Sequence, residues 1–221
     1  MLKEKILILC LFLILVVGIG KTNALLISEF PLLNKIIYID PGHGGVDPGA
    51  VYKELKESDI NLRFAKEIGR KLELAGAEVF YTRIGDYDLS STTNRRKKSD
   101  LSNRIKLIND SDADLYLSIH VNSEECNDWY GAQIFYTNIN KQNEIVALSL
   151  QKQLKKGGVS KRKISVIKNT YMYDRINIAG VLLELGFISN YADREKLQDD
   201  KYVIKFTDLV VKGIVDYLNK T

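Results

Sequence analysis

The chain is poor in cysteine and histidine, with only two of each among 221 residues. Cys10 lies in an apolar N-terminal segment, which leaves Cys126 as the one cysteine of the rest of the chain. A single cysteine can form neither an internal disulfide nor a thiolate cage for a metal. Internal repeats and low-complexity tracts are also lacking, which excludes solenoid architectures and long disordered tails.

A strong excess of charge is lacking as well, because 32 basic residues face 28 acidic ones and the net charge is +4. The basic residues are concentrated in one run, Arg95–Lys98. We expect this run to lie in a solvated loop, and contact with an anionic polymer or lipid surface is the alternative. No aromatic residues alternate with it and no nucleic-acid motif is present, so we expect no nucleic-acid partner.

The one long apolar run is at the N-terminus, where residues 6–20 carry no charge and follow a segment with two lysines. This pattern is typical of an export signal. We therefore expect residues 1–27 to be a signal peptide or an N-terminal membrane anchor, and the protein to be secreted or membrane-anchored. A spanning helix needs about 20 apolar residues, which makes the anchor the weaker interpretation.

Residues 34–220 alternate between strand and helix patterns, which predicts a single α/β domain. We expect a largely parallel, twisted sheet of about six strands flanked by helices. The strand patterns cover residues 36–39, 78–82, 115–119, 133–136, 164–167 and 181–185, and the helical patterns cover residues 59–74, 101–108, 143–155, 193–197 and 202–218. In such sheets, functional sites gather at the carboxyl ends of the strands.

Both histidines follow a strand pattern directly. His43 stands in the glycine-rich loop PGHGGVDPGA, and His120 follows LYLSI. Catalytic zinc sites use three protein ligands, for example two histidines and a glutamate, so a carboxylate is also needed. Glu57 is one candidate, with Glu54 and Asp47 as competitors. An acid beside a helix N-terminus is also favoured by the helix dipole and needs no metal.

Glu184 interrupts VLLELGF, an otherwise apolar strand pattern. Since side chains alternate along a strand, it could point to a solvated face. Its apolar neighbours favour burial instead, and burial raises the pKa of a carboxyl group. A zinc ion would acidify water and polarise a substrate carbonyl. Glu184 is then the candidate general base, which takes the proton of the water and passes it to a leaving nitrogen.

The ordered segments PGHGGVDPGA, KESDINL, LYLSIHVNS, GAQIFY and VLLELGFISN resemble the motifs of the zinc-dependent N-acetylmuramoyl-L-alanine amidases of the amidase-3 type. The resemblance covers about residues 36–220. It implies hydrolysis of the amide between muramic acid and L-alanine in peptidoglycan, with Zn²⁺ held by His43, Glu57 and His120 and with Glu184 as the catalytic residue. Asn122 and Arg175 are the expected substrate-binding residues.

Within the family, RRKKSDLSNRIKLINDSDAD and KRKI look most similar to the CwlD-like germination amidases of spore formers. This resemblance implies action on spore cortex peptidoglycan in the forespore intermembrane space. It also implies an accessory lipoprotein and a de-N-acetylase that acts afterwards in the formation of muramic δ-lactam.

Two other functions remain open on the sequence. A zinc carboxypeptidase of the cell wall would share the same residues but would need a fixed cation for a terminal carboxylate, for which Arg175 or Arg104 could serve. A non-catalytic wall-binding protein is the second alternative. The complete set of candidate ligands and Glu184 favours an enzyme over it.

Overall fold

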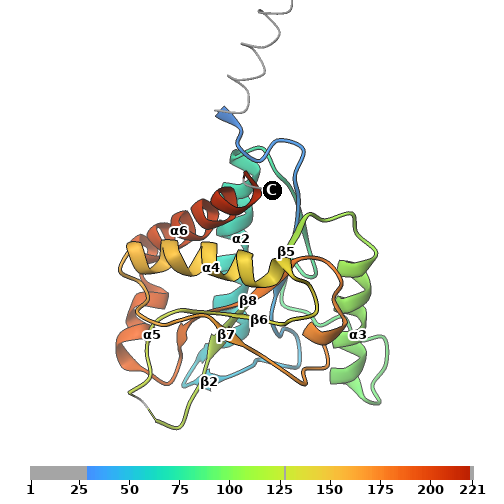
Figure 1. Ribbon diagram of the computed structural model, residues 1–221. Helices are drawn as coiled ribbons and strands as arrows, with labels where there is room; N and C mark the ends of the chain where they lie inside the picture. The colour runs from blue at the N-terminus through green and yellow to red at the C-terminus, as the bar shows by residue number, and fades with distance from the viewer. Residues whose placement is uncertain (1–28, 127, 220–221) are drawn as a thin grey trace, which may run out of the picture.

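A mixed six-stranded sheet forms the centre of the structure, a computed structural model that describes residues 29–126 and 128–219 (Figure 1). The strand order is β4-β1-β5-β8-β6-β7. In this order the strands are β4 (Glu78–Tyr81), β1 (Ile36–Pro41), β5 (Leu115–Asn122), β8 (Gly180–Phe187), β6 (Gln133–Tyr136) and β7 (Ser165–Val166). The predicted fold class is confirmed.

The direction of the strands determines where the ends meet. β1 pairs in parallel with β4 and β5, and β5 pairs in parallel with β8. β6 runs antiparallel to β8, and β7 is parallel to β6. The carboxyl ends of β1, β5 and β8 therefore lie at one edge. A hairpin of β2 (Val51–Tyr52) and β3 (Leu55–Lys56) follows β1, and in Figure 1 it lies at the bottom, opposite the end that carries the first and last described residues.

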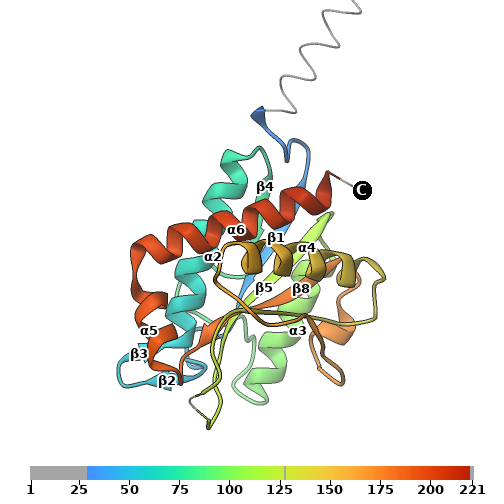
Figure 2. The ribbon, with the colours of Figure 1, turned by 60° about the vertical axis from the view of Figure 1, so that its left-hand side comes forward.

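Helices cover both faces of the sheet (Figure 2). One face carries α2, α4 and α6, with α5 beside them, and the other carries α3 and the short 3₁₀ helix η1. Their limits are α2 (Glu57–Leu74), α3 (Arg96–Asn109), α4 (Gln142–Lys156), η1 (Tyr173–Arg175), α5 (Tyr191–Gln198) and α6 (Asp200–Leu218). Alternate residues of β1 and β5 enter the two cores, since Ile37 and Leu117 face the first layer, and Tyr38 and Tyr116 face the second.

The helical periodicity predicted the buried faces well. Four apolar residues of α2 and five of α6 recur every three or four positions, as on one helix face, and all nine are buried. They are Ile60, Phe64, Ile68 and Leu72 in α2, and Val203, Phe206, Val210, Ile214 and Tyr217 in α6. The predicted ends of the helices and strands were less accurate. The helix α2 begins at Glu57 rather than at Asp59, and the strand β5, predicted to end at residue 119, continues through His120 to Asn122.

The expectation that Arg95–Lys98 forms a loop is wrong. α3 begins at Arg96, and Arg95 precedes it with a left-handed φ of 55°. The four residues are solvent-exposed, as expected. The first turn of α3 escaped detection because it carries no apolar residue, so hydrophobic periodicity begins only at Leu101.

The predicted leader, residues 1–27, lies outside the described residues. Among residues 29–126 and 128–219, no helix combines the length and apolar character that crossing a membrane would need.

Candidate metal centre

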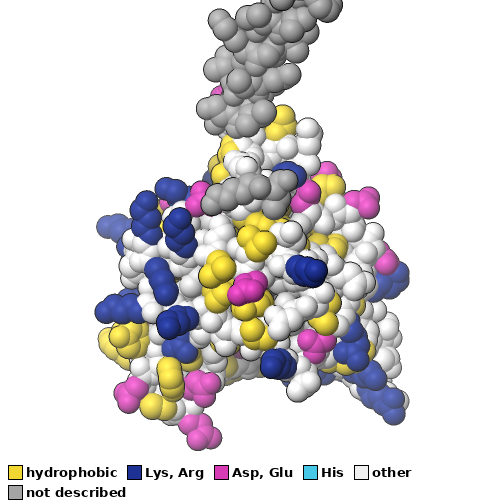
Figure 3. All heavy atoms as spheres, in the orientation of Figure 1, with side chains coloured by type: hydrophobic (Ala, Val, Ile, Leu, Met, Phe, Trp, Pro, Cys, Tyr) yellow, Lys and Arg dark blue, Asp and Glu magenta, His cyan; other side chains and the backbone are white. Residues whose placement is uncertain are grey.

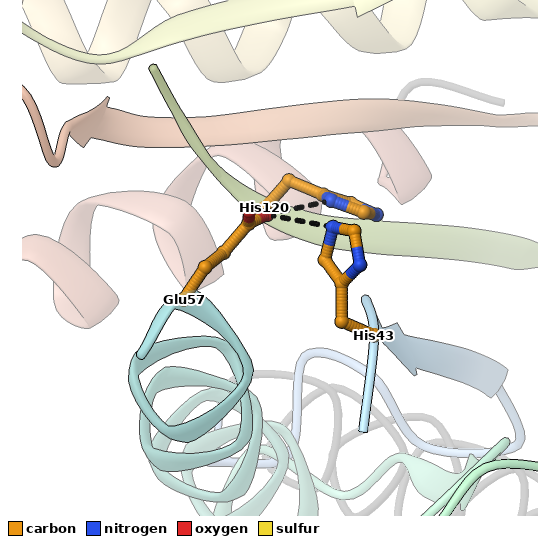
Figure 4. Close-up of side chains that lie close together, drawn as sticks. All are labelled: His43, Glu57 and His120. Carbon is orange, nitrogen blue, oxygen red and sulfur yellow. Dashed lines mark hydrogen bonds and ion pairs between the residues drawn. The ribbon is translucent and has the colours of Figure 1, made fainter. Parts of the chain in front are cut away.

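Three side chains from distant parts of the chain converge at the carboxyl edge of the sheet (Figure 4). His43 follows β1, Glu57 is the first residue of α2, and His120 lies in β5. The Oε1 atom of Glu57 is 3.2 Å from Nε2 of His43 and 2.9 Å from Nδ1 of His120. The two imidazole rings are 4.9 Å apart between centroids and nearly perpendicular.

Backbone groups fix the carboxylate of Glu57 in this position. Its Oε2 accepts a hydrogen bond from the N–H of Ala50 at 2.9 Å, and its Oε1 accepts one from the N–H of Val121 at 3.2 Å. The side-chain amide of Asn61 donates a third bond at 3.3 Å. Burial alone would raise the pKa of Glu57, but hydrogen bonds and attraction from the two imidazoles hold it well below its ordinary value. Glu57 is therefore a carboxylate at neutral pH.

The two competing carboxylates occupy other positions. Asp47 accepts a hydrogen bond at 2.9 Å from Nδ1 of His43, on the opposite side of the ring from Glu57. A histidine that binds a metal commonly donates its other ring N–H to a carboxylate, which fixes the orientation of the ring. Glu54 lies exposed in the turn between β2 and β3. Asp47 thus orients His43, and Glu57 completes the cluster.

Glycine is required in the loop around His43 because the backbone approaches the ring atoms closely. A Cβ atom at Gly42 would lie 2.2 Å from the ring of His120, and one at Gly49 would lie 2.5 Å from Oε2 of Glu57. Gly49 also has a φ of +68°, in the region that favours glycine. The glycine-rich sequence therefore has a steric cause at the cluster itself.

Two buried arginines hold the backbone of the same loop. Arg83 donates to the carbonyl oxygens of Pro41 and Gly42, each at 2.9 Å. Arg104 donates to the carbonyl oxygens of Pro41 at 2.8 Å and of His43 at 2.7 Å. Both side chains are only 1% exposed. Three successive carbonyl groups are thus fixed by guanidinium groups that packing keeps in place.

Asp40 provides the countercharge for Arg104. Its Oδ1 accepts from Arg104 at 2.8 Å and from the hydroxyl of Thr82 at 2.7 Å, and its Oδ2 accepts from Ser118 at 2.7 Å. Although burial would raise the pKa of Asp40, these partners hold it below the ordinary value. Sequence reasoning missed Asp40 and Arg83. A usable signal existed, since each is a charged residue at the end of a strand that reaches the site edge.

Glu184 lies beside the cluster on the neighbouring strand. It is paired in register with His120 across the parallel strands β5 and β8, so the two side chains leave the same face of the sheet. Although Glu184 is only partly buried as a residue, its Oε2 atom is shielded from solvent and has no hydrogen-bond partner in the described part of the chain. Burial, together with the charge of Glu57, raises the pKa of Glu184 to about 8. The expected direction of this shift is confirmed.

The raised pKa predicts a specific pH dependence in metal-free protein. Between pH 5 and 8 the folded state keeps the proton of Glu184, whereas the unfolded chain, with an ordinary pKa of 4.5, loses it. Stability therefore falls as pH rises through this window. Glutamine does not titrate, so the free energy of unfolding of Glu184→Gln should lack this fall. The difference in free energy of unfolding between Glu184→Gln and the wild type should therefore grow, in favour of the variant, by up to about 1.4 kcal/mol for each pH unit in this window. Urea unfolding in chelator at several pH values measures this, and parallel pH curves for the two proteins would contradict it.

The remaining candidate residues differ in position. Arg104 is fully engaged by Asp40, Asp100 and two carbonyl groups, so it is not available to hold a substrate carboxylate. Arg175 is exposed in η1 and stacks on the ring of Tyr171, 4.5 Å from its centroid. Asn122 ends β5, where its side-chain oxygen accepts from the N–H of Ser123. The substrate-binding roles of Arg175 and Asn122 stay predictions.

The donor set of His43, Glu57 and His120 fits a divalent transition metal. The three ligand atoms lie within 4.8 Å of one another, and two imidazole nitrogens with one carboxylate oxygen form a combination found at catalytic zinc sites. In a tetrahedral zinc site neighbouring ligand atoms are about 3.3 Å apart, close to the 3.2 Å between His43 and Glu57. The unpartnered Oε2 of Glu184 is next to this cluster. The structure therefore contains a possible His-Glu-His metal site.

Comparison with known proteins agrees with this geometry. The N-acetylmuramoyl-L-alanine amidase family model matches residues 37–216. The germination-specific N-acetylmuramoyl-L-alanine amidase of Bacillus subtilis is 40% identical over 197 residues, which cover 87% of this chain and 83% of that protein. The solved CwlD amidase of Clostridioides difficile, in complex with the GerS lipoprotein, is 34% identical with a TM-score of 0.81, covering 85% of this chain and 100% of the other.

A second solved amidase, the catalytic domain of CwlV from Bacillus (Paenibacillus) polymyxa, is 27% identical with a TM-score of 0.73, over 85% of this chain and 99% of the other. The family match spans nearly all of the described residues, and the sheet and the convergent cluster lie inside it. The chain therefore belongs to the N-acetylmuramoyl-L-alanine amidase family, whose members hydrolyse the amide bond between N-acetylmuramic acid and L-alanine in peptidoglycan.

Proposed function

We propose that the chain is a zinc amidase of spore cortex peptidoglycan, with Zn²⁺ held by His43, Glu57 and His120 and with Glu184 as the general base. The observation that carries this proposal is the convergence of two imidazoles on one buried carboxylate oxygen, with the unpartnered Oε2 of Glu184 on the adjacent strand. Bound zinc would polarise the substrate carbonyl and make water a better nucleophile at neutral pH.

The residues of the chain have distinct tasks in this mechanism. Asp47 holds His43 in the tautomer that leaves Nε2 free to bind the metal. Glu184 accepts a proton from the attacking water at its carboxylate and donates it to the amide nitrogen as the C–N bond breaks. In metal-free protein the pKa of Glu184 is about 8, but a nearby divalent cation favours the ionised form. With a metal bound, Glu184 would therefore be ionised and able to act as the base.

Identification of the product tests the proposed reaction. We expect purified protein with zinc to release peptides that begin with a free alanine amino group and to leave muramic acid with a free lactyl carboxyl group. Mass spectrometry of digested cortex peptidoglycan distinguishes this from carboxypeptidase action, which releases an amino acid from the other end of the peptide. Release of a terminal amino acid alone would refute the proposal.

The ligand assignment has its own control in the same assay. Because His120 supplies one of three ligands, we expect His120→Ala to lose zinc by elemental analysis and to lose the amidase product. Arg70→Ala, at an exposed surface ion pair with Glu67 on α2, is the matched variant and should keep both. Unchanged zinc content in His120→Ala would show that the ion binds elsewhere.

The relatives support the setting of the reaction. Peptidoglycan lies outside the cytoplasmic membrane, so an amidase of this family acts extracytoplasmically. The germination-specific relative supports a role in spores, and we propose that the chain acts on spore cortex in the forespore intermembrane space after export by its N-terminal segment. We also propose that a de-N-acetylase acts afterwards on the muramic acid that this amidase leaves. Asn122, at the end of β5, is proposed to contact substrate there.

An accessory lipoprotein is a further part of the proposal. The CwlD amidase of Clostridioides difficile was solved in complex with the GerS lipoprotein. The alignment covers 100% of that amidase and 85% of this chain. Of the two cations that could serve a carboxypeptidase, Arg104 is buried and saturated with hydrogen bonds, which leaves only the exposed Arg175, and the product assay above separates the two reactions. The intact ligand set also gives no support to a non-catalytic wall protein.

A further inference from the structure

We propose that Lys98 and Arg175, which lie over the ring of Tyr171, and Lys97, which lines the same cavity as Tyr171, form a binding site for a carboxylate on the peptide part of the substrate. This inference rests on the proposed amidase function and adds to it the chemical feature that the enzyme recognises. A peptide attached to muramic acid through its amino end keeps a carboxylate at its other end or in a side chain unless these carboxyl groups are cross-linked or amidated.

The site borders the cavity that contains the metal ligands. This cavity has a volume of about 380 Å³, and His43 and His120 line it on one side. Lys97 of α3 and the segment 170–173 line it on the other. A substrate whose carbonyl group reaches the metal centre therefore has its remaining atoms within reach of this second wall.

Tyr171 is the fixed element of that wall. Its hydroxyl lies 2.9 Å from the hydroxyl of Ser102 on α3. The Nζ atom of Lys98 and the guanidinium carbon of Arg175 lie over its ring, 5.5 and 4.5 Å from the centroid. Arg175 also donates to the carbonyl oxygen of Tyr171 at 2.8 Å. These cation–π and hydrogen-bond contacts hold two positive groups beside one ring.

The three cations have no carboxylate within ion-pair distance among residues 29–126 and 128–219. In Figure 3, Lys and Arg side chains gather at the lower right, over the first turn of α3. Their charge is thus available to a ligand, and Arg in particular suits the planar geometry of a carboxylate.

The nearby acids are already engaged. Both oxygens of Asp47 are used, by His43 and by the N–H of Gly49. Both oxygens of Asp100 are used as well, by Arg104 and by a backbone N–H. Asp174 accepts the N–H of Thr170 at 2.7 Å. Lys97 attracts Asp47 electrostatically, but none of the three cations forms an ion pair with a carboxylate of the described residues, so an incoming carboxylate would have no ion pair to displace.

A lipid or polymer surface would also attract cations, but the geometry favours a discrete ligand. Lys98 and Arg175 lie over one aromatic ring, that of Tyr171, although they come from α3 and η1. Lys97 lines the metal cavity together with the same tyrosine. The peptide carboxylate is consequently the ligand that we test, and binding to anionic vesicles is the competing outcome.

The experiment compares two soluble muramoyl-peptides that differ only in their peptide carboxyl groups, which are free in one and converted to carboxamides in the other. We expect the triple variant Lys97→Gln/Lys98→Gln/Arg175→Gln to raise KM for the free acid by about tenfold or more. The KM for the carboxamide and both kcat values should stay within about twofold of wild type. All three side chains are exposed, so the fold should tolerate the changes.

Lys205→Gln on α6 is the control, since Lys205 is exposed on the helical layer away from η1. An equal rise of KM for both substrates, or no rise for either, overturns the inference. Loss of binding to vesicles with anionic lipid, without any change in KM, overturns it as well and assigns the cations to a membrane surface. If wild-type protein cleaves neither substrate, the proposed amidase function itself fails.

Discussion

Replacing Glu184 by glutamine should lower kcat by about 10²- to 10⁴-fold, the range that general acid–base catalysis contributes. Glutamine keeps the shape of the side chain but cannot accept the proton of the attacking water. Glu184 is not one of the three clustered ligands, so zinc content should be unchanged. Turnover of a soluble muramoyl-peptide and elemental analysis of the same sample measure both quantities.

The matched control for this variant is Glu78→Gln. Glu78 is also a glutamate on a strand of the sheet, but it is exposed at the start of β4 and pairs with the start of β1, at the opposite edge from the site. We expect wild-type kcat from it. If Glu184→Gln retained more than about a tenth of wild-type kcat, the base would have to be another group.

Replacing Arg104 by methionine should lower the free energy of unfolding by about 3–5 kcal/mol, because it leaves a buried charge without its partner. Asp40 is 1% exposed and its pKa is held low mainly by Arg104. Among the described residues, the hydroxyls of Thr82 and Ser118 would remain as its side-chain partners. The variant also releases the carbonyl groups of Pro41 and His43, so zinc affinity should fall with stability.

Urea unfolding of metal-free protein measures the stability, and a competition assay with a chelator measures the affinity for zinc. Lys106→Met provides the control two residues away on α3, since Lys106 forms only an exposed ion pair with Asp110. Such pairs contribute about 0–1 kcal/mol. A loss of less than about 1 kcal/mol in Arg104→Met would show that the pair with Asp40 is not needed to hold the loop.

The elements with strong periodicity were predictable, and their ends were not. The apolar spacing in α2 and α6 reports burial directly, because one face of each helix must enter the core. The first turn of α3 gave no such signal, since Arg96, Lys97 and Lys98 can be solvated in a helix or in a loop. The polarity of Arg95–Lys98 therefore could not distinguish a helical turn from a loop.

The candidate site was predictable to different degrees. His43 and His120 follow strand patterns, and parallel strands place their carboxyl ends together, so their proximity could be inferred. Glu57 could not be separated from Asp47 and Glu54 by spacing alone. The choice depends on the start of α2, which brings the carboxylate to the N–H groups of Ala50 and Val121.

The sequence by itself determined the α/β class, the faces of the long helices and the edge at which the histidines meet. These depend on periodicity and on strand direction, which are local properties or follow from a general rule. Only the tertiary structure decided that Asp47 contacts the side of His43 opposite Glu57, that Arg83 and Arg104 hold the loop, and that Lys98 and Arg175 meet at Tyr171. Those roles depend on distances between residues far apart in the chain, which the packing of the helices against the sheet sets.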